Sequence, residues 1–432
     1  MRIKVYGAGL AGCEAAAKLS SLGFEVDLFE MKPQKFSPAH KSPLFAELVC
    51  SNSLKAARFN SAAGLLKWEM EQMGSVCVAA AKQCAVPAGG ALAVDRDEFS
   101  RIITEKISND PNITVHQQEV VEINSDEYTI IATGPLTDGK LAESIKELCG
   151  EEYLNFFDAA APIVTAESID MTKAFAASRY DKGDGDDYIN CPLNKEEYER
   201  FRDELVSAER AKQHDADSPL KVYEGCMPIE VLASRGNDAI RFGPMKPVGL
   251  KDPNTGHRPW AVLQLRKENK EATMYNLVGF QTNLKFPEQK RVFGLIPGLE
   301  NAEFVRFGVM HRNSFLNSPK LLNADFSMKK HSKIFFAGQI SGVEGYMESA
   351  ASGIVAALGI AARIKGENTK YFPLYTMTGA LCNHISASES KDFQPMGANF
   401  GILPPLDVNI RDKQERYLAL SNRSKEWFDA NF

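Results

Sequence analysis

The chain has 432 residues, 44% hydrophobic and 25% charged, which is enough for two or three domains with a large core in a soluble globular protein. Its formal net charge of −6 excludes a global field that draws it to nucleic acid or anionic membranes, so RNA binding would need a local basic surface. No apolar run predicts a membrane span, and the first one reads as a core strand rather than a signal peptide, which favours a cytoplasmic protein.

Residues 3–30 predict a βαβ unit that binds a dinucleotide. An apolar strand meets a glycine-rich turn, an alanine-rich helix follows, and a second strand ends at Glu30. Gly7 permits the tight turn, Gly9 lets a pyrophosphate approach the backbone, and Gly12 allows close packing of helix and strand. The predicted cofactor-binding turn consists of Gly7, Ala8, Gly9, Leu10, Ala11 and Gly12, and Glu30 is placed to accept a ribose hydroxyl. The alternative is a glycine-rich turn without a ligand.

The rest of residues 1–165 also reads as α/β, and we expect this range to be the first part of the nucleotide-binding domain. Asp95, with Glu98 three residues later, has the spacing of a helix N-cap. The other expected elements are a helical segment at 45–49, a helix at 60–73, a flexible loop at 87–92, a strand at 113–121, and a buried strand at 129–135 that runs into Gly134.

Residues 166–320 have shorter strands and denser charge, which predicts an inserted α+β domain. Residues 321–432 return to the nucleotide fold and end in a helical segment. There, a strand ends at Gly338 and Gln339, and Gly345 and Tyr346 lead into a helix of small residues. This pattern is typical of FAD folds with two dinucleotide-binding motifs, in which such a helix points its positive end at the flavin. The predicted fold is therefore a Rossmann-like α/β FAD-binding domain with an inserted α+β domain.

Two of the eight cysteines lie in settings that suit a reactive thiol, and none forms a pair with metal-ligand spacing, so no metal site is predicted. Cys226 lies between Gly225 and Pro228, which predicts a sharp, exposed turn. Cys50 precedes Ser51-Asn52-Ser53, which we expect to cap a helix whose N-terminus activates the thiol. Without further information, an inert small hydrophobic residue is the more common state of a lone cysteine.

Residues 241–333 hold sixteen Lys and Arg but only seven Asp and Glu. Basic side chains pair with phosphates and aromatic rings stack on unpaired bases, so this segment is a candidate RNA surface. The alternative is an ordinary solvated face over core aromatics. The basic candidates are Lys246, Arg258 and Arg312, and the interleaved aromatic residues are Trp260, Tyr275, Phe280 and Phe286.

A series of ordered blocks gives the chain a specific resemblance. In chain order they include GAGLAGCEAA, FAELVCSNSL, VPAGGALAVDRDEF, ATGPLT, EGCMPIEV, FGPMKPVGL, VGFQTNLK, GVMHRNSF and FAGQISGVEGY. Together they closely resemble the folate- and FAD-dependent tRNA (uracil-5-)-methyltransferase family TrmFO, from the N-terminus to about residue 364. This family is also similar to the GidA-type flavoproteins.

The resemblance implies FAD, NAD(P)H and 5,10-methylenetetrahydrofolate as cofactors and methylation of C5 of uridine 54 in the tRNA T-loop. It implies that reduced flavin N5 carries the methylene group. Cys226, in the EGC motif, is then the thiolate that adds to uracil C6, and Cys50, in VCSNS, is the candidate base for the C5 proton. Arg96 becomes a folate or flavin contact, and the basic segment becomes the tRNA face.

Three other functions remain open at this stage. The same chemistry on ribosomal RNA would use the same FAD and cysteine motifs. A flavin oxidoreductase acting on a small molecule would need neither folate nor RNA, and the basic segment argues against it. An FAD-containing RNA-binding protein without activity would not need the paired cysteine motifs.

Overall fold

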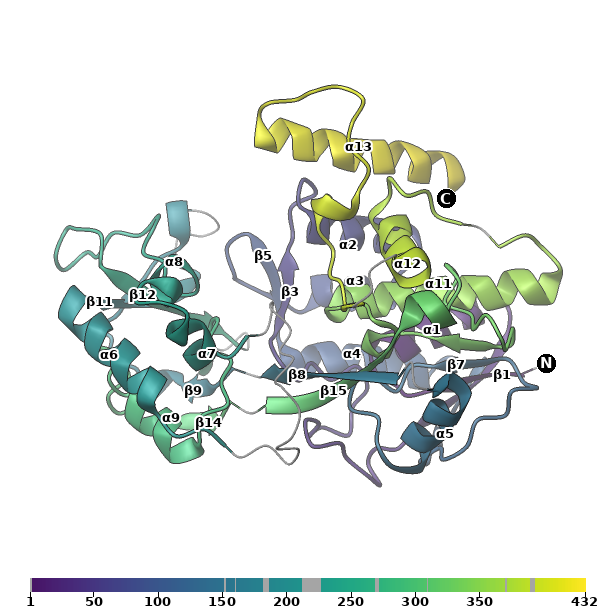
Figure 1. Ribbon diagram of the computed structural model, residues 1–432, viewed down its shortest axis with the longest axis horizontal. Helices are drawn as coiled ribbons and strands as arrows, with labels where there is room; N and C mark the ends of the chain where they lie inside the picture. Colours follow the sequence, from purple (N-terminus) through teal and green to yellow (C-terminus); the bar gives the residue numbers. More distant parts are fainter. Residues whose placement is uncertain are drawn as a thin grey trace.

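The protein has two lobes joined by a two-stranded ladder (Figure 1). The computed structural model describes residues 2–150, 153–159, 161–181, 186–211, 227–268, 272–308, 310–369, 371–388 and 393–432. One lobe contains a parallel sheet with its helices, and the other contains an antiparallel sheet. The ladder pairs β8 (Tyr153–Ala159) with β15 (Met310–Leu316) in antiparallel register. The predicted α/β fold with an inserted α+β domain is confirmed.

The parallel sheet has five strands in the order β16-β7-β1-β2-β6, and every neighbouring pair is parallel. This order places the late strand β16 beside β7, so the chain returns to the sheet it began, as the sequence predicted. The strands are β1 (Arg2–Tyr6), β2 (Glu25–Glu30), β6 (Ile113–Gln117), β7 (Thr129–Ile131) and β16 (Ile334–Phe336).

Small residues allow the two helices that follow β1 and β16 to pack closely. These are α1 (Leu10–Ser21) and α11 (Tyr346–Lys365). A Cβ atom at Gly353 of α11 would lie 2.1 Å from the carbonyl oxygen of Ala11, so only glycine fits there. By length and composition α11 could cross a membrane, but 78% of its most apolar window is buried, as in the core helix of a globular protein.

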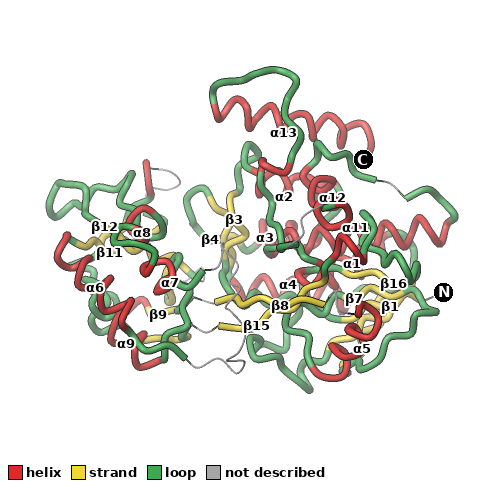
Figure 2. The backbone as a smooth tube through the Cα atoms, viewed as in Figure 1, coloured by secondary structure: helices red, strands yellow, loops and turns green. Residues whose placement is uncertain are grey.

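Other helices complete this lobe (Figure 2). Glu69 joins three of them, because its buried carboxylate accepts the N–H groups of Met377 and Thr378 at the start of α12 and the hydroxyl of Ser424 on α13. The helices are α2 (Ala62–Gln72), α3 (Val76–Gln83), α4 (Arg96–Ser108), α5 (Gly139–Cys149), α10 (Ser318–Leu321), α12 (Met377–Ala387) and α13 (Lys413–Asn431).

The segment between β2 and α4 differs most from the prediction. Residues 45–49 form no helix, and Ser53–Ala56 is a strand, so Ser51–Ser53 do not cap a helix beside Cys50. Asp95 does cap α4, accepting the N–H of Glu98. A small antiparallel sheet of β3 (Ser53–Ala56), β5 (Ala91–Val94) and β4 (Ala85–Val86) flanks the predicted flexible loop.

The second lobe has its own core around a six-stranded sheet. Asn194 and Glu197 form a complete capping box at the start of α6 (Lys195–Ser207), which packs on this sheet. The strand order is β10 (Phe175–Ala176), β11 (Tyr188–Leu193), β12 (Ala261–Lys267), β13 (Met274–Leu277), β9 (Ile163–Thr165) and β14 (Phe304–Arg306). The remaining helices are α7 (Ile229–Ser234), α8 (Ala239–Phe242) and α9 (Phe286–Phe293).

Candidate functional site

The glycine turn after β1 is shaped for close approach by a ligand. Gly7 has a φ of +95°, and a Cβ atom there would lie 2.7 Å from the carbonyl oxygen of Ala132. A Cβ atom at Gly12 would lie 1.8 Å from the carbonyl oxygen of Gly7, so these two glycines permit the fold itself. A Cβ atom at Gly9 would meet no atom within 4 Å. The space beside Gly9 is therefore open, as a pyrophosphate requires.

Glu30 holds this turn against the end of β2. Its buried carboxylate accepts the N–H of Ala8 at 2.9 Å and that of Lys32 at 3.0 Å. Each carboxylate oxygen retains further lone pairs for a ribose hydroxyl. Glu30 thus shapes the turn and also lines the adjoining cleft.

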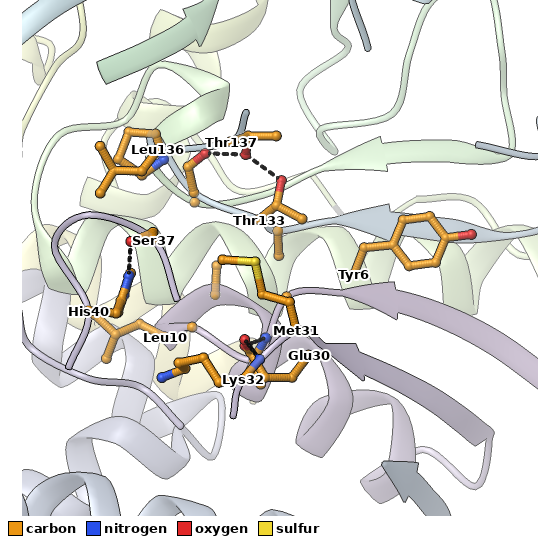
Figure 3. Close-up of a pocket in the computed structure, with 18 of the residues that line it drawn as sticks. Tyr6, Leu10, Glu30, Met31, Lys32, Ser37, His40, Thr133, Leu136 and Thr137 are labelled. Carbon is orange, nitrogen blue, oxygen red and sulfur yellow. Dashed lines mark hydrogen bonds between the residues drawn. The ribbon is translucent and has the colours of Figure 1, made fainter. Parts of the chain in front are cut away.

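The cleft runs across the carboxyl ends of the parallel strands and has a volume of about 1270 Å³, including space open to solvent. Figure 3 shows Leu10, Glu30 and Lys32 on one side and Thr133, Leu136 and Thr137 on the other. A crevice at this edge of an open parallel sheet is the usual ligand site of such folds. Of the predicted cofactor residues, the ones that line it are Gly7, Ala8, Gly9, Leu10, Ala11, Glu30, Gly134, Gly338, Gln339 and Tyr346.

The turn after β16 forms another part of the cleft wall. Gly338 has a φ of +82°, and its N–H donates to the hydroxyl of Ser352 on α11. The side-chain amide of Gln339 donates to Glu344 at 2.6 Å, which leaves its carbonyl oxygen for a ligand. Gly345, with a φ of +121°, precedes α11 but does not itself line the cleft. The open glycine turn, the carboxylate of Glu30 and this helix N-terminus fit a bound FAD.

Lys32, Ser37 and His40 also line the cleft, although they were not among the predicted cofactor residues. The Ser37 hydroxyl lies 2.6 Å from Nδ1 of His40 (Figure 3). Burial lowers the pKa of His40. These residues come from the polar loop after β2, where no motif marked them. The only sign in the sequence that they line the cleft is their position shortly after Glu30.

The Cys50 loop, residues 48–52, is tied to the start of α11. The hydroxyl of Tyr346 accepts the backbone N–H groups of Cys50 and Ser51. Burial is the main cause that raises the pKa of Tyr346, so its phenol stays protonated. Because Tyr346 lines the cleft, Cys50 lies one hydrogen bond away from a residue of the cleft wall.

Three arginines hold the same loop, and we call them the arginine clamp: Arg96, Arg266 and Arg306. Arg306 donates to the carbonyl oxygens of Val49 at 2.9 Å and Cys50 at 3.0 Å. Arg266 donates to the Ser51 hydroxyl and to Oδ1 of Asn52. Arg96 donates to the Leu48 carbonyl and to Glu268, and it is not among the residues lining the cleft.

Cys50 is the only cysteine with partial exposure among those in the described part of the chain. Burial raises the pKa of Cys149 and of Cys191 to about 12, so these thiols are inert at neutral pH. Cys226, the predicted nucleophile, lies outside the described residues. Within the described ranges no group of His, Cys, Asp and Glu could hold a metal ion.

The basic segment contributes an exposed surface, and its aromatics follow the alternative of ordinary packing and not that of base stacking. Lys246 and Arg258 are exposed, whereas Arg312 lies on β15 and its side chain is outside the description. Tyr275 and Phe280 are buried in the core of the second lobe and cannot stack on a base. The other two rings are also engaged: Phe286 stacks on Phe307, and Trp260 lies under the guanidinium of Arg241 at 3.8 Å.

Comparisons with known proteins place this geometry in a family. A family model described as "Glucose inhibited division protein A" matches residues 2–368. The Methylenetetrahydrofolate--tRNA-(uracil-5-)-methyltransferase TrmFO of Acetivibrio thermocellus is 59% identical over 422 residues, covering 98% of this chain and 96% of that protein. The protein of the same name from Desulfitobacterium hafniense is 57% identical over 422 residues, again covering 98% of this chain and 96% of its own length.

The solved structures agree on the fold. Aquifex aeolicus GidA, in its form II crystal, superposes with a TM-score of 0.68 at 15% identity and covers 99% of this chain and 73% of its own. The form I crystal gives 0.67 at 16% identity, with 99% and 76% coverage. At this identity the match supports the architecture alone, including the parallel sheet and the inserted domain.

Proposed function

Because this chain belongs to the glucose-inhibited division protein A family, and within it to the TrmFO methyltransferases, we propose that it methylates C5 of a uracil in the tRNA T-loop. The one-carbon donor is 5,10-methylenetetrahydrofolate and the reductant is NAD(P)H, in the cytoplasm. The structural observation that supports this is the placement of Cys50 beside a cleft that fits FAD, joined to it through Tyr346. Ribosomal RNA is the alternative target.

FAD, when bound in the cleft, supplies the redox chemistry and the carrier atom for the one-carbon unit. The protein's own contribution is to bind and orient it. The turn from Gly7 to Gly12 receives the pyrophosphate, and Glu30 receives the ribose. The N-terminus of α11 at Tyr346 carries a partial positive charge at the cleft wall and would favour negative charge on a bound cofactor.

Two thiols carry out the chemistry on uracil. C5 of uracil is a poor nucleophile, and addition of the Cys226 thiolate at C6 turns C5 into the nucleophilic carbon of an enolate. After C5 has gained the one-carbon unit, Cys50 removes the C5 proton, and the electron pair of the broken C–H bond forms an exocyclic C5=CH2 double bond as the carrier leaves. A hydride that originates in NAD(P)H then reduces this methylene to methyl, and the electron pair gained at C5 expels the Cys226 thiolate from C6, which restores the C5–C6 double bond.

We assign FAD binding to one lobe and RNA binding to the other, as expected from the sequence. Residues 1–165, except strand β9 (Ile163–Thr165) of the second lobe's sheet, form the FAD-binding part together with residues 321–432, and residues 166–320 present the RNA surface with Lys246 and Arg258. Arg312 is assigned to the same surface. This division places the Cys50 loop where the two lobes meet, because Arg266 and Arg306 reach it from the inserted domain.

The test uses purified holoenzyme, tRNA lacking the T-loop methyl group, labelled methylenetetrahydrofolate and NADPH, followed by nucleoside mass analysis. Label in 5-methyluridine at the T-loop supports the proposal, and the Cys226→Ala and Cys50→Ala variants should lose it while retaining flavin. Cys84→Ala, at a buried cysteine outside the cleft, is the matched control. Label only in a ribosomal RNA fragment would change the target, and label in neither RNA would overturn the proposal.

A further inference from the structure

The arginine clamp concentrates positive charge at the Cys50 loop. Within the described residues, only one of the three guanidinium groups is ion-paired: Arg96 pairs with the carboxylate of Glu268. Arg266 is buried, and Arg306 is partly buried with its Nε atom sealed from solvent and unpartnered. Buried positive charge in excess of its acidic partners is costly unless an anion lies nearby.

Cys50 is the group placed to be that anion. The thiol of Cys50 interacts electrostatically with Arg96, with Arg266 and with Arg306, and also with Tyr346. These groups come from four elements that pack on the loop: α4, β12, β14 and α11. Among the described residues, Glu268 directly after β12, which pairs with Arg96, and Tyr188 of β11, which borders Arg266, also face the arginine clamp.

Arg306 has the most direct relation to the cysteine. Its two terminal nitrogens bind the carbonyl oxygens of Val49 and Cys50, and one of them also reaches the carbonyl of Ala161 at 3.3 Å. A planar guanidinium can hold adjacent acceptors with fixed geometry, whereas an ammonium acts as a point charge. The backbone of the reactive residue is therefore fixed by a side chain of the inserted domain.

We propose that Arg306 is a positioning residue for Cys50: its fork fixes the loop backbone, and its charge favours the thiolate that accepts the C5 proton. The inference rests on the proposed role of Cys50. Because β14 belongs to the RNA-binding lobe, Arg306 also links that lobe to the position of the Cys50 thiol.

The experiment follows alkylation of Cys50 by iodoacetamide in the holoenzyme across a range of pH, with peptide mass spectrometry to separate Cys50 from Cys226. The plateau rate at high pH reports access to the thiol, and the midpoint of the profile reports the charge around it. The variants are Arg306→Gln, which removes the charge, and Arg306→Lys, which keeps the charge but removes the fork. Arg291→Gln, at an exposed arginine of α9 in the same lobe, is the control.

We expect Arg306→Gln to move the midpoint to higher pH and to slow alkylation at pH 7 roughly three- to tenfold, as loss of a nearby cation requires. Arg306→Lys should keep the wild-type midpoint but lower kcat for RNA methylation without raising KM for RNA. A midpoint that Arg306→Gln leaves unchanged, or that Arg291→Gln shifts equally, would overturn the role of the charge.

Two further outcomes bear on the role of Arg306: an unfolded Arg306→Gln variant and a wild-type enzyme without methylation activity. If Arg306→Gln does not fold, as judged by circular dichroism and flavin content, a wild-type kcat in Arg306→Lys would still refute the positioning role. If the wild-type enzyme methylates no RNA, the proposed function fails, whereas the alkylation profiles continue to test the effect of Arg306 on Cys50.

Discussion

The phenolic oxygen of Tyr346 lies 2.7 Å from the backbone nitrogen of Cys50 and accepts its N–H. The two residues are far apart in the sequence, and this bond joins the first residue of α11, in the cleft wall, to the loop with the candidate base. The bond therefore couples the start of α11 to the backbone of the cysteine.

Replacing Tyr346 with Phe removes the shared acceptor of two backbone N–H groups, those of Cys50 and Ser51. Both N–H groups are part-buried, and loss of the partner of a buried donor costs at most about 1–3 kcal/mol. We expect a lower melting temperature, and RNA methylation reduced by more than about tenfold because the loop is displaced. Tyr371→Phe, at an exposed tyrosine, is the control. Wild-type melting and methylation in Tyr346→Phe would show that the bond does not position Cys50.

Gly9 offers a test of the cofactor cleft that separates binding from folding. A Cβ atom there meets no protein atom within 4 Å, so Gly9→Ala should leave the melting temperature of the flavin-free protein unchanged. In the cleft the same methyl group would obstruct the pyrophosphate, and we expect the Kd for FAD to rise at least about tenfold. Flavin fluorescence titration measures this. The control is Gly236→Ala, where a Cβ atom also meets nothing within 4 Å but far from the turn. Equal FAD affinity in both variants would argue against a pyrophosphate at Gly9.

Charge reversal at Lys246 and Arg258 tests the RNA surface. Both side chains are exposed on the inserted domain, so the double change to Glu should leave folding intact. Each lost phosphate contact is expected to reduce the salt slope of binding by about 1 and to weaken binding to different RNA sequences about equally. Electrophoretic mobility shifts with tRNA at several salt concentrations give the slope. Lys106→Glu, an exposed lysine on α4, should bind like the wild type, and an unchanged slope in the double variant would remove these residues from the interface.

Local sequence patterns predicted the nucleotide fold well, because its features lie within a few residues of one another. The turn from Gly7 to Gly12 and the cap at Asp95 each depend on short-range spacing. The parallel sheet then follows from the order of the strands. The helix predicted at residues 45–49 is absent because the apolar residues there are buried by tertiary contacts. Phe45 and Leu48 are buried, and Ala46 has a φ of +49° and donates its N–H to the carbonyl of Ala8.

The surroundings of Cys50 could not be predicted in the same way. Arg306 binds the Cys50 carbonyl across 256 residues of sequence, and Arg266 binds Ser51 across 215. In the sequence both arginines belong to a basic segment and resemble RNA contacts. Only the fold shows that they face inward, towards the Cys50 loop. The sequence instead predicts a helix cap at Ser51–Ser53 that would activate the Cys50 thiol. The sequence left two interpretations of the aromatics of that segment, and the fold decides for the core at Tyr275 and Phe280.

Lys67 on α2 gives a prediction about pH and stability. The side chain is buried, its Nζ donates to the Leu54 carbonyl at 2.7 Å, and burial lowers its pKa from 10.5 to about 8. Between these values the unfolded chain holds the proton and the folded protein does not, so this residue adds stability as the pH rises from about 8 to 10.5. Below pH 8 the folded protein bears the full cost of the buried charge.

Replacing Lys67 with Met removes that charge, keeps a side chain of similar length, and leaves the Leu54 carbonyl without its donor. The pKa difference corresponds to about 3 kcal/mol at most, and the lost hydrogen bond offsets about 1 kcal/mol of it. We therefore expect the variant to exceed the wild type in free energy of unfolding by about 1–2 kcal/mol at pH 7, and this advantage to shrink and vanish by about pH 10. Urea unfolding followed by circular dichroism at both pH values gives the difference, with Lys106→Met as the exposed control. A difference that does not change with pH would mean that Lys67 titrates alike in the folded and unfolded chains.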